Sequence, residues 1–250
     1  MEKYILVTGA TGGIGNAIAM KLADAGYSLI LMGRNEEALN NLLHNLSGTR
    51  HLTWAGDIRD KPKLLSFANE LAEIKLSGII ANAGIGGENT FEDKDRWNEI
   101  IETNLTGTYL TVNSMFPLLV SNPEPFKQVI IISSILARLG VAGYSAYCAS
   151  KAGLLGLMRS WAIEWAPQGI LVNAICPGWV KTKMSEQGMQ GIADKLGVTT
   201  EEFFDIAMQS VPLKKMSSPA EIADLVHWML TQQSMTGQTI DINNGAIMNS

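Results

Sequence analysis

Near its N-terminus the chain reads Tyr4-Ile5-Leu6-Val7-Thr8-Gly9-Ala10-Thr11-Gly12-Gly13-Ile14-Gly15. The apolar run from Tyr4 to Thr8 predicts a buried strand, and residues 14–25 have helical spacing and end at Gly26. Glycines between a strand and a helix allow a tight turn, so that a diphosphate can approach the amino end of the helix. A plain flexible loop is the alternative. We expect a dinucleotide to be bound by Gly9, Thr11, Gly13, Ile14 and Gly15.

The rest of the chain repeats this alternation of short strands and longer helical segments. Further strands are predicted at residues 28–32, 51–54, 78–81, 128–133, 171–175 and 239–242, and helices include 36–46 and 146–166. Repeated βαβ units of this kind form a parallel sheet. Because no long linker or internal repeat interrupts the pattern, we expect a single α/β domain over residues 1–250.

Composition limits the classes of function. Of 250 residues, 46% are hydrophobic and 17% are charged, and the net charge is −5 with scattered lysines and arginines, so a nucleic-acid partner is not expected. The apolar runs are too short to cross a membrane or to act as a signal peptide. Two cysteines and three separated histidines provide neither a disulfide framework nor a metal site. These features predict a cytoplasmic protein without a metal.

A segment at residues 183–212 departs from the regular alternation. It contains Met184, Met189, Met208 and two helical stretches. An insertion at this point of an α/β protein usually covers a ligand site, so we expect a substrate lid. Flexible methionine surfaces favour an acyl chain or another apolar body over a sugar, although methionines also fill gaps in ordinary cores.

Two polar positions follow the second and third predicted strands. Arg34 stands where dinucleotide sites often have a carboxylate for the ribose, and its guanidinium suits a 2′-phosphate; a solvated arginine that opens a helix is the alternative. The carboxylate of Asp57, which precedes Ile58, is expected to accept from the adenine amino group, to cap the next helix, or to do both. NADP(H) is therefore the expected cofactor, with NAD(H) still open.

Tyr147 and Lys151 are four residues apart and share one face of a predicted helix. An ammonium beside a phenol favours the phenolate, which would lower the pKa of Tyr147 and make it a proton donor and acceptor. Taken alone, such a pair is usually an ordinary helix surface. Its meaning depends on the motifs around it.

Those motifs occur in a recognisable order: Thr8-Gly9-x-x-x-Gly13-Ile14-Gly15, Asn82-Ala83-Gly84, Asn104, Ser134, Tyr147-x-x-x-Lys151 and Pro177-Gly178 with Thr182. With them the whole chain resembles the short-chain dehydrogenase/reductase family in its compact form, and is similar to 3-oxoacyl-[acyl-carrier-protein] reductases and related ketoreductases. The resemblance implies a Rossmann-type three-layer αβα sandwich with a seven-stranded parallel sheet. Two departures are Ala81 before Asn82, where the family usually has a second asparagine, and Asn244 before Gly245, where it more often has glycine.

The resemblance also implies roles for individual residues. Ser134 would stabilise the oxyanion, Tyr147 would supply the proton, Lys151 would lower the Tyr147 pKa and hold the nicotinamide ribose, and Asn104 would hold a water of the proton relay. Ser133, Cys148 and Ser150 would be packing neighbours only. Further cofactor contacts would come from Asn82, Ala83, Gly84, Tyr147, Lys151, Pro177, Gly178, Val180 and Thr182.

The expected activity is NADPH-dependent reduction of a ketone, such as a 3-oxoacyl thioester, to a secondary alcohol. An NAD-dependent alcohol or 3-hydroxyacyl dehydrogenase is the alternative, and a cofactor-binding regulator without turnover is disfavoured by the intact catalytic set. The resemblance further implies a homotetramer. Apolar residues of one helix are compatible with burial at its interface, although an ordinary core would show the same pattern: Leu154, Leu155, Leu157, Met158 and Trp161.

Overall fold

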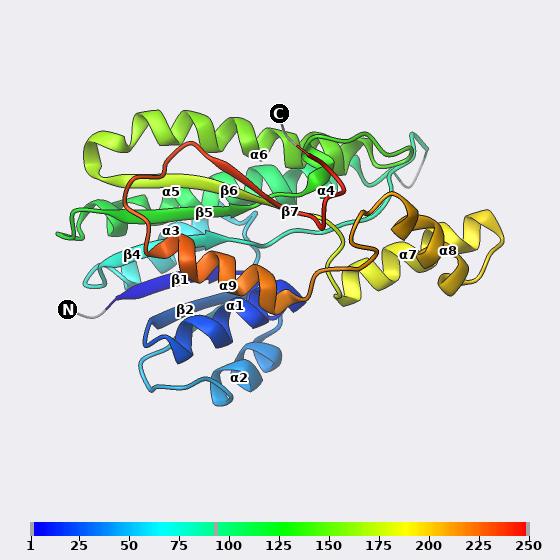
Figure 1. The fold of residues 1–250 in the computed structure, drawn as a ribbon. Helices are drawn as coiled ribbons and strands as arrows, with labels where there is room; N and C mark the ends of the chain where they lie inside the picture. The colour runs from blue at the N-terminus through cyan, green and yellow to red at the C-terminus, as the bar shows by residue number, and fades with distance from the viewer. Residues whose placement is uncertain (1–2, 93–94, 249–250) are drawn as a thin grey trace.

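The computed structural model describes residues 3–92 and 95–248. Its centre is a parallel sheet of seven strands in the order β3-β2-β1-β4-β5-β6-β7 (Figure 1). The strands are β1 (Tyr4–Thr8), β2 (Ser28–Gly33), β3 (Leu52–Ala55), β4 (Leu76–Ala81), β5 (Lys127–Ile132), β6 (Ile170–Pro177) and β7 (Thr239–Ile242). The predicted seven-stranded parallel sheet is confirmed, with strand ends displaced by one or two residues.

Helices cover both faces of the sheet. One face carries α1 (Gly13–Asp24), α2 (Glu36–His44) and α9 (Pro219–Leu230), and the other carries α3 (Lys61–Glu70), α5 (Gly107–Val120) and α6 (Ser145–Glu164) (Figure 1). The buried strands β1, β4 and β5 supply side chains such as Leu6 and Ile5 alternately to the two apolar cores. This arrangement is the expected three-layer αβα sandwich.

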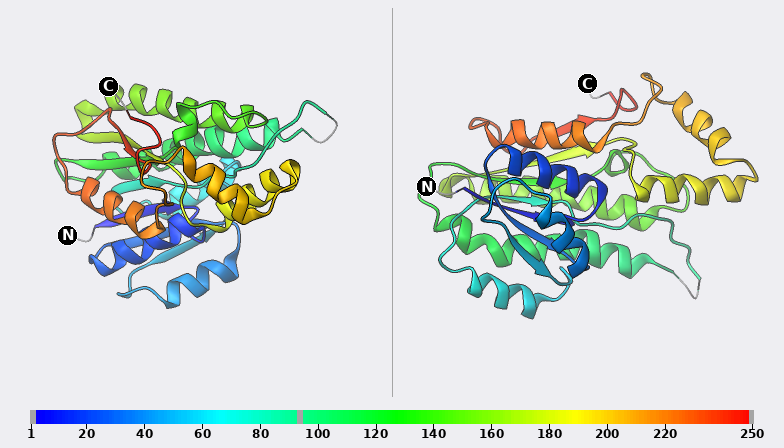
Figure 2. Two further views of the ribbon diagram at one scale, coloured as in Figure 1. Left: turned by 45° about the vertical axis from the view of Figure 1, so that its right-hand side comes forward. Right: turned by 90° about the horizontal axis from the view of Figure 1, so that it is seen from below.

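Residues 183–212 form two helices, as predicted. They are α7 (Lys183–Leu196) and α8 (Thr200–Gln209), each of which starts at a threonine whose side chain caps the helix. The pair projects beyond the sheet in Figure 2 and has a small apolar cluster of its own. Met189 and Met208 lie inside that cluster, whereas Met184 is 46% exposed. Only Met184 of the three therefore offers a methionine surface.

The apolar residues of α6 belong to the protomer itself. Leu154, Leu155, Met158 and Trp161 are all buried within the main core, and Leu157 is packed against it. Of the two interpretations of these residues, the structure supports the ordinary core, because α6 covers the sheet with this face. Ile163, which is 81% exposed, lies on the part of α6 that the protomer leaves uncovered.

Candidate active site

The sheet order reverses between β1 and β4, so the chain leaves these neighbouring strands in opposite directions. A crevice at the carboxyl ends of the strands is the usual ligand site at such a point. The Thr8 hydroxyl, at the end of β1, accepts hydrogen bonds from the backbone N–H groups of Asn82 (3.0 Å) and Ala83 (2.9 Å). The Asn82 amide donates in return to the carbonyls of Thr8 (3.0 Å) and Gly9 (3.2 Å). Thr8 thus connects the end of β1 to the segment after β4, a role that the sequence motif did not reveal.

The glycine-rich turn comes too close to its neighbours for larger residues. Gly9 has φ +62°, and a Cβ there would lie 2.8 Å from the Cα of Ala83. A Cβ on Gly15 would collide with the carbonyl oxygen of Gly9. Gly12 and Gly13 are exposed at the start of α1, where Gly12 has no side chain with which to cap the helix. The unsubstituted, solvent-facing amino end of α1 fits a diphosphate group.

Asn104 lies in η1 (Glu102–Thr106), a π-helical turn between α4 (Trp97–Ile101) and α5. It is completely buried, and its amide Oδ1 accepts from the N–H of Ile85 (2.8 Å). Its Nδ2 donates to the carbonyl of Ile85 (2.9 Å) and to the Ser150 hydroxyl (3.1 Å). Both protons of the Asn104 side-chain amide are therefore engaged within the protein. A water bound to Asn104 would have to donate a hydrogen bond to one of its oxygen atoms. Single π-turns occur frequently at functional sites.

Ser134 and Tyr147 approach each other from separate elements. Ser134 ends the segment after β5, and its hydroxyl accepts from the N–H of Leu136 (3.1 Å) at the start of η2 (Ile135–Ala137). Tyr147 lies in the first turn of α6. Burial raises the pKa of Tyr147 to about 12, and a hydrogen bond with Ser134 opposes the rise. A hydroxyl pair of this kind can donate to one carbonyl oxygen.

Lys151 lies one turn after Tyr147 and is 5% exposed. Its Nζ donates to the carbonyl of Ile132 (3.0 Å) and lies 5.6 Å from the centroid of the Tyr147 ring. Burial lowers the pKa of Lys151 to about 8. The net shift of the Tyr147 pKa is thus upward, opposite to the shift expected from a neighbouring ammonium, because burial is its largest cause.

Two of the supposed packing neighbours take part in this hydrogen-bond network. The Ser133 hydroxyl donates to the carbonyl of Lys151 (2.9 Å), and the Ser150 hydroxyl donates to the carbonyl of Tyr147 (2.8 Å). Ser150 also accepts from Asn104, as described above. These serines thus do more than fill space, because their hydroxyls connect α6 to the segment after β5 and to η1. Cys148 is partly exposed and its Sγ lies 3.5 Å from the carbonyl of Leu139.

The predicted contacts for the nicotinamide end gather after β6. Gly178 N–H donates to the carbonyl of Ile242 (3.0 Å), and Val180 pairs with Ser217. The Thr182 side chain caps α7, and a Cβ on Gly13 would lie 2.7 Å from its Cγ2. The N-terminal end of α7 therefore touches the glycine-rich turn. Pro177 is the last residue of β6, whereas Gly84 lies three residues after the end of β4. A Cβ on Gly84 would lie 3.5 Å from Nζ of Lys151.

On the side of the sheet formed by β2 and β3, Arg34 is exposed immediately after β2. Asp57 follows β3, but Asp60, not Asp57, caps α3 by accepting from Lys63 N–H (3.1 Å). The capping role expected for Asp57 is wrong, because the helix starts three residues later. The Ile58 side chain is buried in the core, where a Cβ on Gly107 would touch it, so only the Ile58 main chain is free for a ligand.

Within residues 3–92 and 95–248, no helix combines the length and apolarity of a membrane span. Over the same residues, no group of three or more His, Cys, Asp or Glu side chains is placed to hold a metal ion.

An open αβα sandwich that has a glycine-rich turn at its switch point, with a partly exposed tyrosine beside buried Asn, Ser and Lys side chains, defines a dinucleotide-dependent oxidoreductase. The family model for short chain dehydrogenases matches residues 3–192, and the protein belongs to this family. It is therefore an NAD(P)-dependent enzyme.

Several relatives match the protein over nearly its whole length. It is 33% identical to the 3-oxoacyl-[acyl-carrier-protein] reductase FabG of Rickettsia felis, over 98% of this chain and 97% of the relative. FabG of Aquifex aeolicus is 32% identical, over 97% and 96% of the two chains. Among solved structures, an actinorhodin polyketide ketoreductase with NADPH has a TM-score of 0.91 and 30% identity, over 98% and 97% of the chains.

Proposed function

We propose that the protein reduces the ketone of a 3-oxoacyl thioester to a secondary alcohol, with NADPH as the hydride donor. The observation that carries the proposal is the placement of Tyr147 beside Ser134, with Lys151 and Asn104 buried behind them. The names of the relatives support the substrate class, since FabG and polyketide ketoreductases act on ketoacyl groups by name.

Each residue of the group has a distinct task in this reaction. The hydroxyls of Ser134 and Tyr147 hold the substrate carbonyl oxygen and stabilise the negative charge that develops on it. The high pKa of Tyr147 keeps its proton in place until that oxygen becomes basic, and Tyr147 then donates it. Lys151 and Asn104 restore the proton from solvent. NADPH, bound along the crevice, supplies the hydride.

Arg34 supports the phosphorylated cofactor, because it is exposed immediately after β2 and carries a guanidinium that suits a phosphate. A cofactor with an unmodified ribose is usually bound by a carboxylate at this position. Neither Gly33 nor Asn35 provides such a carboxylate. An NAD-dependent alcohol or 3-hydroxyacyl dehydrogenase is the competing function.

The test follows oxidation of NADPH and NADH in parallel, with a 3-oxoacyl thioester and several unrelated ketones. Faster NADPH oxidation with the thioester is the expected result, and Tyr147→Phe is expected to lower kcat by at least about 100-fold. Preference for NADH, or turnover only of the alcohol, would favour the dehydrogenase. Unchanged turnover in Tyr147→Phe would show that Tyr147 is not the proton donor.

A homotetramer remains part of this proposal. Its support lies on the outer surface, where Tyr109 of α5 (47% exposed) and Ile163 of α6 (81% exposed) leave apolar area uncovered. The mass of the protein in solution, measured by light scattering, distinguishes a tetramer from a monomer.

A further inference from the structure

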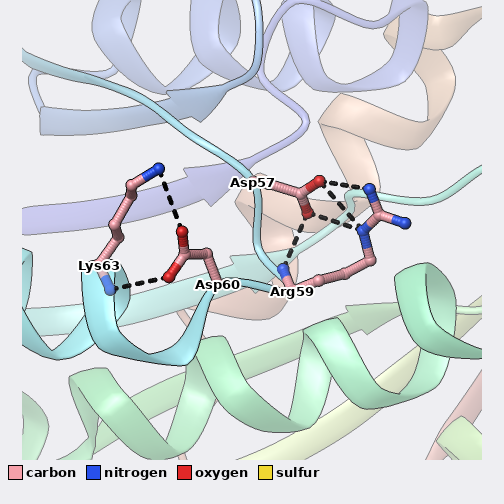
Figure 3. A network of polar contacts seen from close by, with 4 residues as sticks. All are labelled: Asp57, Arg59, Asp60 and Lys63. Atoms are coloured by element: carbon pink, nitrogen blue, oxygen red, sulfur yellow. Dashed lines mark hydrogen bonds and ion pairs between the residues drawn. The ribbon is translucent and has the colours of Figure 1, made fainter.

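Asp57 is held by Arg59, two residues later, in a closed ion pair (Figure 3). Oδ1 of Asp57 accepts from the backbone N (2.9 Å) and Nε (3.0 Å) of Arg59. Oδ2 accepts from Nε (3.0 Å) and Nη2 (2.5 Å) of the same arginine. Both carboxylate oxygens are thus engaged by one guanidinium, in the fork geometry that makes arginine–carboxylate pairs strong.

The pair lies next to Arg34. Gly33 of β2 pairs with Ala55 of β3, and the N–H of Gly56 donates to the carbonyl of Gly33 (2.8 Å), so the two strands end together. Arg34 directly follows Gly33, and Asp57 directly follows Gly56, so both residues lie just beyond the ends of the two strands. Hydrogen bonds from Arg59 chiefly lower the pKa of Asp57, and the positive charge of Arg34 adds to the effect. Asp57 is therefore ionised at neutral pH between two arginines.

Stability alone is a weak reason for this arrangement. The side chains of Arg59 and Asp57 are 38% and 32% exposed, and ion pairs with this exposure add little to folding free energy. The charge balance at the edge is a stronger reason. Without Arg59, the negative charge of Asp57 would offset the positive charge of Arg34. It would also repel the 2′-phosphate of a phosphorylated dinucleotide.

We propose that Arg59 is a specificity-determining residue for a 2′-phosphorylated dinucleotide, because it neutralises Asp57 and leaves the positive charge of Arg34 available at the edge. The inference rests on the proposed NADP(H) preference and adds a residue to it.

Other charged groups also face Arg59. Glu102 of η1 and Glu99 of α4 both favour its protonated form, after the larger effect of Asp57. Glu99 is itself paired with Arg96 (2.8 Å), so its charge is already balanced. Arg59 accordingly stays cationic, and its own pairing is with Asp57.

The experiment measures the dissociation constants of NADP⁺ and NAD⁺ by calorimetry, without turnover. Its readout is the ratio of the NAD⁺ constant to the NADP⁺ constant, which cancels effects shared by both ligands. Arg59→Gln is expected to lower the ratio about fivefold, as loss of one compensating charge in a partly solvated site implies. Arg59→Lys is expected to keep most of it. Lys63→Gln is the matched control, because Lys63 pairs with Asp60 (3.1 Å) instead of Asp57.

A double variant separates neutralisation from direct contact with the phosphate. Asp57→Asn removes the charge that Arg59 compensates, so it is expected to raise the ratio. Asp57→Asn combined with Arg59→Gln is expected to restore the wild-type ratio. A double variant that stays as low as Arg59→Gln would overturn the proposal. Thermal denaturation verifies that every variant is folded.

The two proposals fail in different ways. A wild-type ratio at or below one overturns the NADP(H) preference and, with it, the role of Arg59. A wild-type ratio well above one that Arg59→Gln leaves unchanged overturns the role of Arg59 alone.

Discussion

The side-chain amide of Asn104 donates a hydrogen bond to the hydroxyl of Ser150 at 3.1 Å, and so joins the π-helical turn to α6. Both residues are completely buried. The same hydroxyl donates to the carbonyl of Tyr147. Ser150 therefore connects Asn104 to the turn of α6 that carries the proposed proton donor.

Replacing Ser150 by alanine is expected to leave one amide proton of Asn104 unpaired in the interior. The cost in folding free energy is about 1–3 kcal/mol. We also expect kcat to fall roughly tenfold with little change in KM, because in the proposed mechanism Asn104 serves the proton route and does not bind substrate. Urea denaturation and steady-state kinetics measure the two effects. Ser114→Ala, at a buried serine of α5, should leave kcat unchanged, and an equal loss in both variants would contradict the role of Ser150.

Lys151 makes folding stability depend on pH in a defined direction. Burial lowers its pKa to about 8, whereas an unfolded lysine titrates near 10.4. Between these values the unfolded chain binds more protons, so the free energy of unfolding should rise with pH. Tyr147 acts in the opposite direction above about pH 10, because its folded pKa is the higher one.

The measurement compares the wild type with Lys151→Met by urea denaturation at about pH 7, 8.5 and 10. Lys127, whose pKa burial also lowers, is common to both proteins and cancels in the difference. The wild-type stability minus the variant stability should increase with pH. A flat difference would mean that Lys151 has an ordinary pKa in the folded protein.

Much of the fold could be predicted because its signals are local. Apolar runs marked β1 and β7 to the residue, and Gly26 with φ +86° follows α1 where a stop was expected. The cofactor turn was also predictable, because its glycines lie between a strand and a helix. Such features depend on neighbours in the sequence.

The remaining features depend on contacts between distant segments. Neither the Ser150–Asn104 bond nor the π-turn has a sequence signal. The bond joins η1 to α6, which are 46 residues apart at this contact. Two acidic residues, Asp57 and Asp60, precede α3, and only the position of the first helical turn decides which one caps it. The raised pKa of Tyr147 could not be predicted either, because the four-residue spacing reveals the nearby lysine but not the burial that dominates the shift.

The close approach at Gly15 predicts a strong effect of a single methyl group. In Gly15→Ala the added Cβ would meet the Gly9 carbonyl and the Asn82 amide, so the turn must open. We expect NADP⁺ binding to weaken at least tenfold, because the backbone would no longer hold the diphosphate at the helix end. Gly191→Ala, at an exposed site of α7 with open space around it, should keep the affinity and add up to about 1 kcal/mol of stability. Equal affinities in both variants would contradict a cofactor role for the turn.

The proposed substrate lid, residues 183–212, is tied to the rest of the protein by an ion pair between Lys195 of α7 and Glu88 of the loop after β4. Nearby, the Met184 sulfur lies 3.2 Å from the position of a Cβ on Gly86, so α7 covers this loop. Lys195→Gln should loosen the contact between α7 and this loop. Because α7 belongs to the proposed substrate lid, KM for the ketone should rise about two- to fivefold at low salt, as expected for an exposed ion pair. The kcat and the affinity for NADPH should stay unchanged. Reversing both charges, with Lys195→Glu and Glu88→Lys, should restore KM. A rise in the NADPH dissociation constant with an unchanged KM would instead place this contact at the cofactor, and residues 183–212 would not be the substrate lid.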